Sequence, residues 1–427
     1  MARADQHRRK PAATARRVRV RIEDIAAGGD GVGIVDGARI FAPLTAPGDL
    51  ADIDLRGERG TLVDLIEKGP DRIVPPCGHY GSCGGCSLQH VTHGFYRDWK
   101  RSRLLQALAR EGFDAAIVGG LIETPAATRR RARFAVKKLR GRALVGFNGR
   151  RSSTIEAVDD CLILHPGIAT RLPALRALAM KIEAAEFDLT ATLCDNGIDV
   201  AISAALVKDP RGPALSDILS LLRGADVVRL SVNGETIAMT AAPVVRFDGV
   251  PVTPPPGGFL QASREGEAAL INLVKAAAAG ARKVADLFSG CGTFALPLAR
   301  AATVFAVDSD RASIDALLKA AAAAQGGGLN PLKAETRDLF TRPMTARELK
   351  GFDAIIFDPP RAGAAAQARE IAASGVGAVI GVSCNPASFA RDAAILRQGG
   401  FTLSQAFPID QFVYSSHVEA VGVFRKG

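Results

Sequence analysis

The cysteines of this chain fall at spacings that suggest two kinds of chemistry. Cys77, Cys83 and Cys86 form a C-x5-C-x2-C motif inside the glycine-rich segment PPCGHYGSCGGCS, which is too poor in apolar residues to pack a core by itself. Closely spaced thiols in such a segment indicate a metal site, and Cys161, at the start of CLILHP, is the best candidate for a fourth ligand. Four thiolates suit either a tetrahedral zinc ion or an iron–sulfur cluster, so the ligand count leaves both open.

Cys384 indicates a different use of sulfur. It ends the apolar run GAVIGVSC (377–384) and precedes Asn-Pro, so its side chain should emerge at the end of a strand, where it suits nucleophilic attack better than core packing. A thiolate that adds to C6 of a uracil ring makes C5 able to attack a methyl group, and a base must then remove the C5 proton. Glu419 in SHVEAVGVF is the leading candidate for that base, with a satisfied edge-strand glutamate as the structural alternative.

A glycine turn indicates an adenosine cofactor. The segment GCGTFA (290–295) satisfies the G-x-G-x-x-A pattern, and Asp308 follows at a distance suited to holding a ribose hydroxyl. The turn alone is compatible with NAD or with S-adenosylmethionine. The DPPR segment at 358–361 favours the second, because methyltransferases place such a turn against the cofactor and the substrate.

Alternating strands and helices should position these residues. Strands are predicted at 284–288, 303–308, 352–360 and 377–384, and a helix at 293–302. This alternation predicts a parallel sheet with right-handed crossovers, in which ligands lie beyond the carboxyl ends of the strands. The residues at those ends are Asp286, Asp308, Asp358 and Cys384. We therefore expect an α/β fold with a C-terminal Rossmann-like class I methyltransferase domain.

The rest of the chain divides where its composition changes. Residues 1–17 form a basic arm, and short apolar runs between glycine turns over 18–70 predict a small β-barrel, either a capping domain or a nucleic-acid-binding one. The cysteine segment and a mixed α+β central region, expected to bind RNA, occupy 71–258. The proline-rich PVTPPPGGF marks the boundary with the methyltransferase region at 259–427.

Charge points to nucleic acid as the partner. The 427 residues include 54 Lys or Arg and 44 Asp or Glu, for a formal net charge of +10. The segment from Arg129 to Arg142 holds eight basic residues and no acid, a stripe that attracts phosphate, although a solvated basic face is the alternative. The longest small-apolar run, 371–384, is too short to span a membrane, and no apolar stretch follows the basic arm as a secretory signal requires. We expect a cytoplasmic protein that does not bind membranes.

Several segments together resemble the RNA uracil-5-methyltransferases: GGFLQAS, DLFSGCGTFALPLA, FDPPRAG, SCNPASFARD and HVEAV, with the C-x5-C-x2-C segment. The resemblance covers about residues 18–427 and is greatest to the 23S ribosomal RNA branch, which carries an iron–sulfur cluster and an N-terminal TRAM barrel. It implies that Cys384 is the nucleophile and Glu419 the base. It assigns S-adenosylmethionine binding to Gln261, Phe288, Thr293, Asp308, Asp338 and Asp358. It also implies a four-iron, four-sulfur cluster held by Cys77, Cys83, Cys86 and Cys161.

The resemblance predicts methyl transfer from S-adenosylmethionine to C5 of a specific uridine in 23S ribosomal RNA through a covalent cysteine–C6 adduct, with no obligate protein partner. Transfer RNA is the alternative substrate, because the chemistry at uracil is identical. Three other classes are disfavoured. An exocyclic-amino methyltransferase has no use for Cys384 and Glu419, a binding protein with a degenerate site would not need them, and an oxidoreductase would need a hydride-transfer constellation that is missing here.

Overall fold

The computed structural model describes residues 15–204 and 214–427, and most of the basic arm predicted over 1–17 lies outside these ranges. Contacts divide the chain into two compact units. The first contains the N-terminal residues through Gly81 together with 86–96 and 414–416, and the second contains 82–85, 97–413 and 417–427. No helix within the described ranges is long and apolar enough to cross a membrane.

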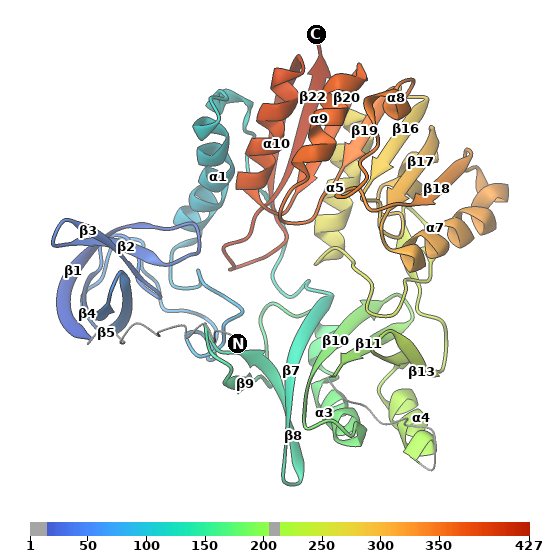
Figure 1. The fold of residues 1–427 in the computed structure, drawn as a ribbon. Coiled ribbons are helices and arrows are strands. Elements are labelled where there is room, and N and C mark those ends of the chain that lie inside the picture. The colour runs from blue at the N-terminus through green and yellow to red at the C-terminus, as the bar shows by residue number, and fades with distance from the viewer. Residues whose placement is uncertain (1–14, 205–213) are drawn as a thin grey trace, which may run out of the picture. The chain divides into compact units, whose positions relative to one another are not determined.

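The first unit is built on a closed five-stranded barrel, which confirms the small N-terminal β-barrel (Figure 1). Its order is β1-β2-β3-β5-β4, with bounds β1 (Arg16–Ile25), β2 (Gly31–Val35), β3 (Ala38–Ala42), β4 (Leu50–Arg56) and β5 (Arg59–Glu67). Alternate residues of β1 point inward, so that Val20 and Ile22 pack with Ile40 and Ile53 in the barrel core.

A seven-stranded sheet forms the central region of the second unit. Its order is β13-β12-β11-β10-β7-β8-β9, with bounds β7 (Arg131–Leu139), β8 (Arg142–Asn148), β9 (Ile155–Ala157), β10 (Glu186–Cys194), β11 (Gly197–Ser203), β12 (Val227–Val232) and β13 (Glu235–Met239). Three helices accompany it: α2 (Pro166–Ala169), α3 (Leu172–Lys181) and α4 (Ala214–Gly224). Leu175 of α3 and Leu222 of α4 share one apolar core with Phe134 of β7.

An eight-stranded Rossmann-like sheet carries the predicted site. Its order is β18-β17-β16-β19-β20-β22-β21-β6, with bounds β16 (Lys283–Leu287), β17 (Thr303–Asp308), β18 (Leu332–Thr336), β19 (Ala354–Phe357), β20 (Ala378–Ser383), β21 (Phe401–Asp410), β22 (Glu419–Lys426) and β6 (Ile122–Glu123). Strands β16 to β20 run parallel, and β22 is antiparallel to both of its neighbours. The α/β prediction is therefore confirmed.

Helices cover both faces of this sheet. One face packs against α5 (Arg264–Ala277), α6 (Ala295–Leu298), α7 (Arg311–Ala324) and the hairpin of β14 (Val245–Phe247) and β15 (Val250–Val252). The other packs against α1 (His93–Arg110), α8 (Ala346–Leu349), α9 (Ala365–Ser374) and α10 (Pro386–Gln398). Neighbouring residues of a strand serve opposite faces, as Ile355 and Ile356 of β19 do. In Figure 1, α9 and α10 lie in front of the sheet and α5 lies behind it.

Two predicted elements are much shorter than expected, and one of them is the strand predicted over 352–360, of which only β19 (Ala354–Phe357) forms. The helix predicted over 293–302 is the single turn α6. It cannot start earlier, because Gly292 has a φ of +103°, outside the helical region. It ends because the chain must turn back into β17 at Thr303, and the N–H of Ala301 donates to the carbonyl of Leu298 in a tightened last turn.

Candidate active site

The carboxyl ends of four strands bring four of the predicted site residues to one edge of the Rossmann-like sheet. Leu287, the last residue of β16, pairs with Val307 of β17 on one side and with Phe357 of β19 on the other. The strands β17 and β19 lie on opposite sides of β16, so the strand order changes direction there. Parallel sheets bind ligands in the crevice at such a point. The predicted residues that emerge there are Phe288, Asp308, Asp358 and Cys384.

Asp308 fastens the glycine turn that follows β16. One of its carboxylate oxygens accepts the N–H of Gly290 at 2.8 Å, and the other accepts the N–H of Asp310 at 2.8 Å. Within the turn, a Cβ on Gly292 would lie 2.5 Å from Leu317 of α7, so only glycine fits. Thr293, another predicted cofactor residue, lies partly buried directly after Gly292. The turn is therefore held by its own strand neighbours.

Phe288 has an unusual backbone. Its φ is +66°, in the left-handed region that bulky side chains avoid, at a cost of about 1–3 kcal/mol that functional sites often carry. This conformation directs its ring against Phe357 and against Phe340, with ring centroids 6.0 and 5.6 Å apart. Phe340 belongs to the exposed loop after β18, in which Asp338 accepts the N–H of Phe340 at 2.9 Å. That hydrogen bond is the main cause that lowers the pKa of Asp338.

Two buried polar residues at this edge have no hydrogen-bond partner among the described residues. Both carboxyl oxygens of Asp286 and the hydroxyl of Ser289 are in this state. Burial, and then the charge of Asp358, raises the pKa of Asp286 well above its usual value, while the nearby N–H of Ala295, which is not in hydrogen-bonding geometry, acts in the opposite direction. Unpartnered buried groups cost about 1–3 kcal/mol each, so they fit a site that a polar cofactor completes. Sequence analysis placed Asp286 at a strand end without a role and missed Ser289; a carboxylate inside the buried strand VADLF was the available signal.

The partly buried Asp358 and the buried Glu419 form an acidic pair. Burial and then the charge of Asp308 raise the pKa of Asp358 to about 7. Burial and then the charge of Asp358 raise the pKa of Glu419 to about 8. Near neutral pH these groups therefore share protons, and a bound cation would favour their ionised forms.

Hydrogen bonds on both sides hold Cys384. Ser383 accepts the N–H of Asn385 at 3.2 Å, and Asn385 caps α10 by accepting the N–H of Ala387 at 3.2 Å. The amide of Asn385 also donates to the carbonyl of Arg361 at 3.0 Å. The DPPR turn and the residue after Cys384 are thereby joined, which fixes the thiol relative to Asp358.

The Cys384 thiol is protonated at rest. Burial, followed by the negative charges of Glu419 and Asp358, raises its pKa to about 11, while Arg361 acts in the opposite direction. The Arg361 guanidinium lies 3.0 Å from Nδ1 of His417, whose pKa is lowered to about 4 by burial and then by Arg361. The neutral imidazole of His417 thus contacts Arg361, the arginine whose charge favours the Cys384 thiolate.

The strand register sets Cys384 beside Glu419. β20 and β22 pair antiparallel, with Val382 opposite Val421 and Ser383 opposite Ala420. The same register, continued by one residue, places Cys384 opposite Glu419, although 35 positions separate them in the sequence. The thiol and the carboxyl that were predicted as nucleophile and base are therefore neighbours.

Gln411 connects Glu419 to Gln261. Its Nε2 donates to Oε2 of Glu419 at 2.7 Å and to Oε1 of Gln261 at 2.8 Å, and all three side chains are buried. Gln261 was a predicted cofactor residue, whereas sequence analysis assigned nothing to Gln411. A lone glutamine in a connecting segment gives no sequence signal.

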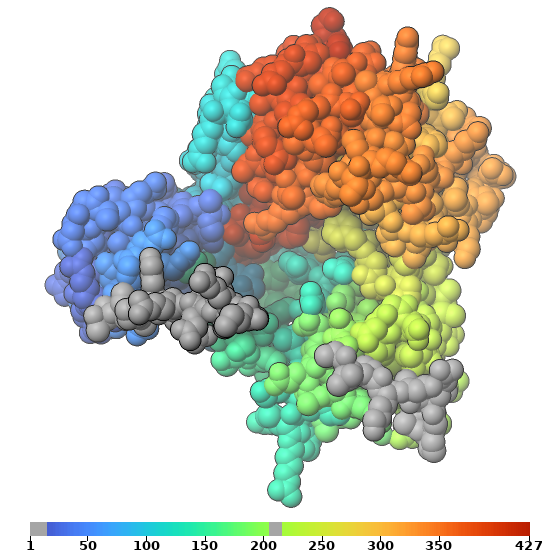
Figure 2. Space-filling view, viewed as in Figure 1, coloured from blue at the N-terminus to red at the C-terminus, as the bar shows by residue number. Residues whose placement is uncertain are grey.

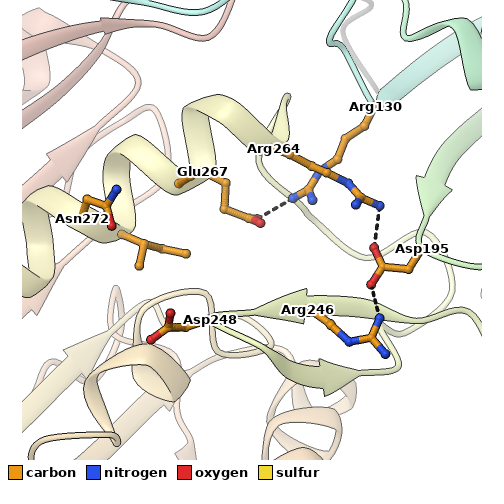
Figure 3. Close-up of a pocket in the computed structure, with 9 residues that line it drawn as sticks. Arg130, Asp195, Arg246, Asp248, Arg264, Glu267 and Asn272 are labelled. Atoms are coloured by element: carbon orange, nitrogen blue, oxygen red, sulfur yellow. Dashed lines mark hydrogen bonds and ion pairs between the residues drawn. The ribbon is translucent and has the colours of Figure 1, made fainter.

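Arg130 holds the segment that carries Gln261. Its Nε donates to the Gln261 carbonyl at 3.1 Å, and its Nη2 pairs with the buried carboxylate of Glu267 in α5 (Figure 3). Arg130 and Glu267 line a cavity of about 480 Å³, whose other charged residues are also paired: Asp195, Arg246, Asp248 and Arg264. Sequence analysis placed Arg130 in the phosphate-binding stripe, but its side chain is buried and serves the fold.

The rest of the basic stripe is unevenly exposed. Arg133 pairs with Asp188 at 2.5 Å and Lys137 with Glu186 at 2.6 Å, because β10 runs beside β7 and supplies acids that the local sequence lacks. Arg140 and Arg142 lie at the exposed β7–β8 turn, which projects from its sheet (Figure 2). These two arginines are exposed and, unlike Arg133 and Lys137, have no ion pair within the described residues.

Comparison with known proteins identifies the family. Residues 257–426 match the model of the tRNA (uracil-5-)-methyltransferase family. An RNA methyltransferase from Rhizobium meliloti, named as uncharacterized, is 43% identical over 415 residues, which is 95% of this chain and 99% of that protein. The chain belongs to the RNA (uracil-5-)-methyltransferase family. It is an S-adenosylmethionine-dependent enzyme that methylates uracil in RNA.

More distant methyltransferases span nearly the whole chain as well. The 23S rRNA (uracil(1939)-C(5))-methyltransferase of Chromohalobacter salexigens is 32% identical over 417 residues, covering 92% of this chain and 86% of that protein. The crystal structure of Pyrococcus abyssi tRNA (uracil-54, C5)-methyltransferase with S-adenosyl-L-homocysteine superposes with a TM-score of 0.70 at 22% identity, covering 95% of this chain and all of that one. The second comparison confirms the fold.

The predicted cluster cysteines of this methyltransferase are all partly buried. Cys77 and Cys86 belong to the first compact unit, and Cys83 and Cys161 belong to the second. Within the described ranges, no three His, Cys, Asp or Glu side chains are grouped so as to hold a metal ion. The iron–sulfur cluster therefore stays a prediction from sequence.

Proposed function

We propose that the enzyme methylates C5 of a uridine in 23S ribosomal RNA through a covalent bond between Cys384 and C6 of the base. The antiparallel register that sets Cys384 beside Glu419 carries this proposal, because the reaction needs a nucleophile and a base on one ring. The Chromohalobacter salexigens relative, named as a 23S rRNA methyltransferase, supports the choice of RNA.

The reaction balances with these two side chains. The Cys384 thiol first loses its proton to water; the thiolate then forms a bond to C6, and the C5–C6 electron pair moves toward O4 to give an enolate. S-adenosylmethionine supplies a methyl group to C5 and leaves as S-adenosylhomocysteine. Glu419 then accepts the C5 proton, and the electrons of that C–H bond restore the double bond as the C6–S bond breaks. Glu419 must be ionised at this point, although its pKa is near 8 in the unliganded site.

We assign cofactor binding to residues of the strand-end edge. The six predicted residues are Gln261, Phe288, Thr293, Asp308, Asp338 and Asp358. To these we add Asp286 and Ser289, because their buried polar atoms have no partner among the described residues. The Phe288 and Phe340 rings offer an apolar surface for a purine, and the buried ring of Phe357 packs against Phe288.

Two variants test the assignment of the nucleophile and the base. Glu419→Gln should form the adduct, accept the methyl group and then stall, because the C5 proton has no acceptor. It should accumulate a methylated protein–RNA species that survives denaturing electrophoresis. Cys384→Ala should neither form this species nor methylate RNA. If Cys384→Ala still methylates, the covalent route through Cys384 is wrong; if Glu419→Gln turns over normally, another group is the base.

The RNA target needs its own experiment. Transfer RNA remains the alternative, supported by the family model that matches residues 257–426. Mapping of 5-methyluridine in both RNAs, from cells with and without this gene, names the substrate and the position together. A missing modification in transfer RNA alone would overturn the ribosomal assignment.

We further propose that Cys77, Cys83, Cys86 and Cys161 hold a four-iron, four-sulfur cluster. The donor chemistry of four partly buried thiols supports this assignment. Methyl transfer consumes no electrons, so the cluster should stabilise the fold or position RNA. Anaerobically purified protein should contain iron and acid-labile sulfide, which Cys83→Ser lowers and Ser82→Ala does not. Zinc in place of iron, or turnover that requires an added reductant, would contradict the proposal.

A further inference from the structure

The side-chain amide of Gln411 is fully engaged inside the protein. Its two N–H groups go to Gln261 and Glu419, at 2.8 and 2.7 Å, and its oxygen accepts the N–H of Ala262 at 3.2 Å. A flipped amide would set its oxygen against two oxygen acceptors and leave the Ala262 N–H unpaired. The three partners therefore permit one orientation only.

The surroundings of Gln411 fix this amide in place. A Cβ on Gly266, in the first turn of α5, would lie 2.7 Å from Cβ of Gln411, so the helix start packs directly against it. On either side of Gln411, Lys100 donates to Oδ1 of Asp410 at 2.7 Å and to the carbonyl of Phe412 at 3.2 Å. The side chain and its backbone are both held.

We propose that Gln411 is a positioning residue that orients the Glu419 carboxyl for proton removal and couples it, through the same amide, to Gln261. This inference rests on the proposed function, in which Glu419 is the base and Gln261 binds the cofactor. A shift of Gln261 on cofactor binding then reaches Glu419 through one side chain. In this inference Gln411 acts through its hydrogen bonds to Glu419 and Gln261 and not through contact with the substrate or the cofactor.

The charges around Glu419 determine what the amide does. Asp358 and the Cys384 thiol face it at the site, Arg361 lies beyond the thiol, and the Lys100–Asp410 ion pair lies behind Gln411. Burial and Asp358 raise the pKa of Glu419, and the hydrogen bond from Gln411 acts in the opposite direction. Loss of the amide should therefore move the ionisation of Glu419 to higher pH.

Gln411→Met tests the inference, with Gln405→Met on the exposed side of β21 as the matched control. The measurement is single-turnover methylation against pH at saturating S-adenosylmethionine, with adducts quantified on denaturing gels. In Gln411→Met the midpoint of the pH–rate profile should move to higher pH by about one unit. The free energy of a hydrogen bond to a charged group corresponds to a pKa shift of roughly that size. The adduct should accumulate at neutral pH, and calorimetry should show weaker S-adenosylhomocysteine binding. Gln405→Met should match the wild type.

A second variant covers a failure of Gln411→Met to fold. Gly266→Ala keeps the amide, and its helical backbone suits alanine, but the added Cβ would lie 2.7 Å from Cβ of Gln411 and displace that residue. It should move the pH profile in the same direction. A general loosening of the fold would lower the rate equally at every pH and leave no adduct.

The outcomes separate this inference from the proposed function. If Glu419→Gln accumulates the adduct while Gln411→Met or Gly266→Ala keeps the wild-type pH profile, the role of Gln411 is overturned and the mechanism stands. If Cys384→Ala methylates RNA, the mechanism fails whatever the Gln411 variants do.

Discussion

Lys100 of α1 and Asp410 at the end of β21 form an ion pair with 2.7 Å between Nζ and Oδ1, and both side chains are buried. The same ammonium donates to the carbonyl of His417 at 2.6 Å. Lys100 thus holds both ends of the segment between β21 and β22, which begins with Gln411 and leads into Glu419, the first residue of β22.

Lys100→Met should therefore destabilise the protein severely. It leaves Asp410 buried without its cation, which typically costs ~3–5 kcal/mol. The chain has a single tryptophan, Trp99, next to Lys100, so its fluorescence reports unfolding of this region in urea. Lys319→Met on the exposed face of α7 is the control. Adding Asp410→Asn to Lys100→Met should recover part of the loss; an unchanged midpoint in Lys100→Met would contradict the prediction.

Cofactor binding should release protons near neutral pH. In the unliganded site the pKa values of Asp358 and Glu419 are about 7 and 8, so both carboxyls are partly protonated near neutral pH. The sulfonium of S-adenosylmethionine is a cation and lowers these pKa values, whereas S-adenosylhomocysteine is uncharged at sulfur. Affinity for S-adenosylmethionine should consequently rise with pH up to about 8.

Calorimetry in buffers of different ionisation enthalpy measures these protons directly. At pH 7.5, S-adenosylmethionine should release more protons than S-adenosylhomocysteine. Asp358→Asn should remove most of the difference. Equal release by both ligands would mean that the acidic pair does not sense the sulfonium.

The exposed end of the basic stripe should dominate RNA binding by this region. Arg133 and Lys137 already pair with acids of β10, whereas Arg140 and Arg142 have no ion pair within the described part of the chain. Replacing Arg140 and Arg142 by alanine should lower the log–log salt slope of RNA affinity by roughly 0.7–0.9 for each lost phosphate contact. The same change at Arg133 and Lys137 should lower it less. Equal slopes in both double variants would favour a merely solvated face.

Gly292→Ala should weaken cofactor binding at least tenfold. The added Cβ would lie 2.5 Å from Leu317, and the φ of +103° is one that alanine avoids, so the glycine turn must move. Gly280→Ala provides the control, because Gly280 has a φ of +85° but open space around its Cβ position. Isothermal titration with S-adenosylhomocysteine compares the two. A similar affinity in both variants would show that steric conflict at the turn is unimportant.

The sequence predicts the parallel strands well because their signal is local. The runs at 303–308 and 377–384 correspond to β17 (Thr303–Asp308) and β20 (Ala378–Ser383) within two residues. Strands buried on both faces are continuous apolar runs, and turn residues end them. The length of the helix predicted over 293–302 was wrong, because nothing in its local sequence shows how soon the chain must enter the next strand.

The site is only partly predictable, for a related reason. Cys384 and Glu419 stand out because reactive side chains are unusual in apolar runs. Gln411 and Lys100 do not stand out, since each acquires its role from partners distant in the chain; Gln411 bonds to a residue 150 positions away. In the same way, a run of arginines does not reveal that Arg130 is buried against Glu267.

The short strand β6 shows how the two sheets of the second unit are connected. β6 and α1 precede the central sheet in sequence, yet β6 pairs with β21 and α1 packs in the core of the Rossmann-like sheet. The chain thus leaves that sheet at Glu123 and returns to it through α5. Limited proteolysis at one site within the central sheet would therefore leave each fragment anchored to the Rossmann-like sheet. An expression fragment that starts at 259 would lack both Lys100 and β6, so the catalytic part has to be produced from His93 onward.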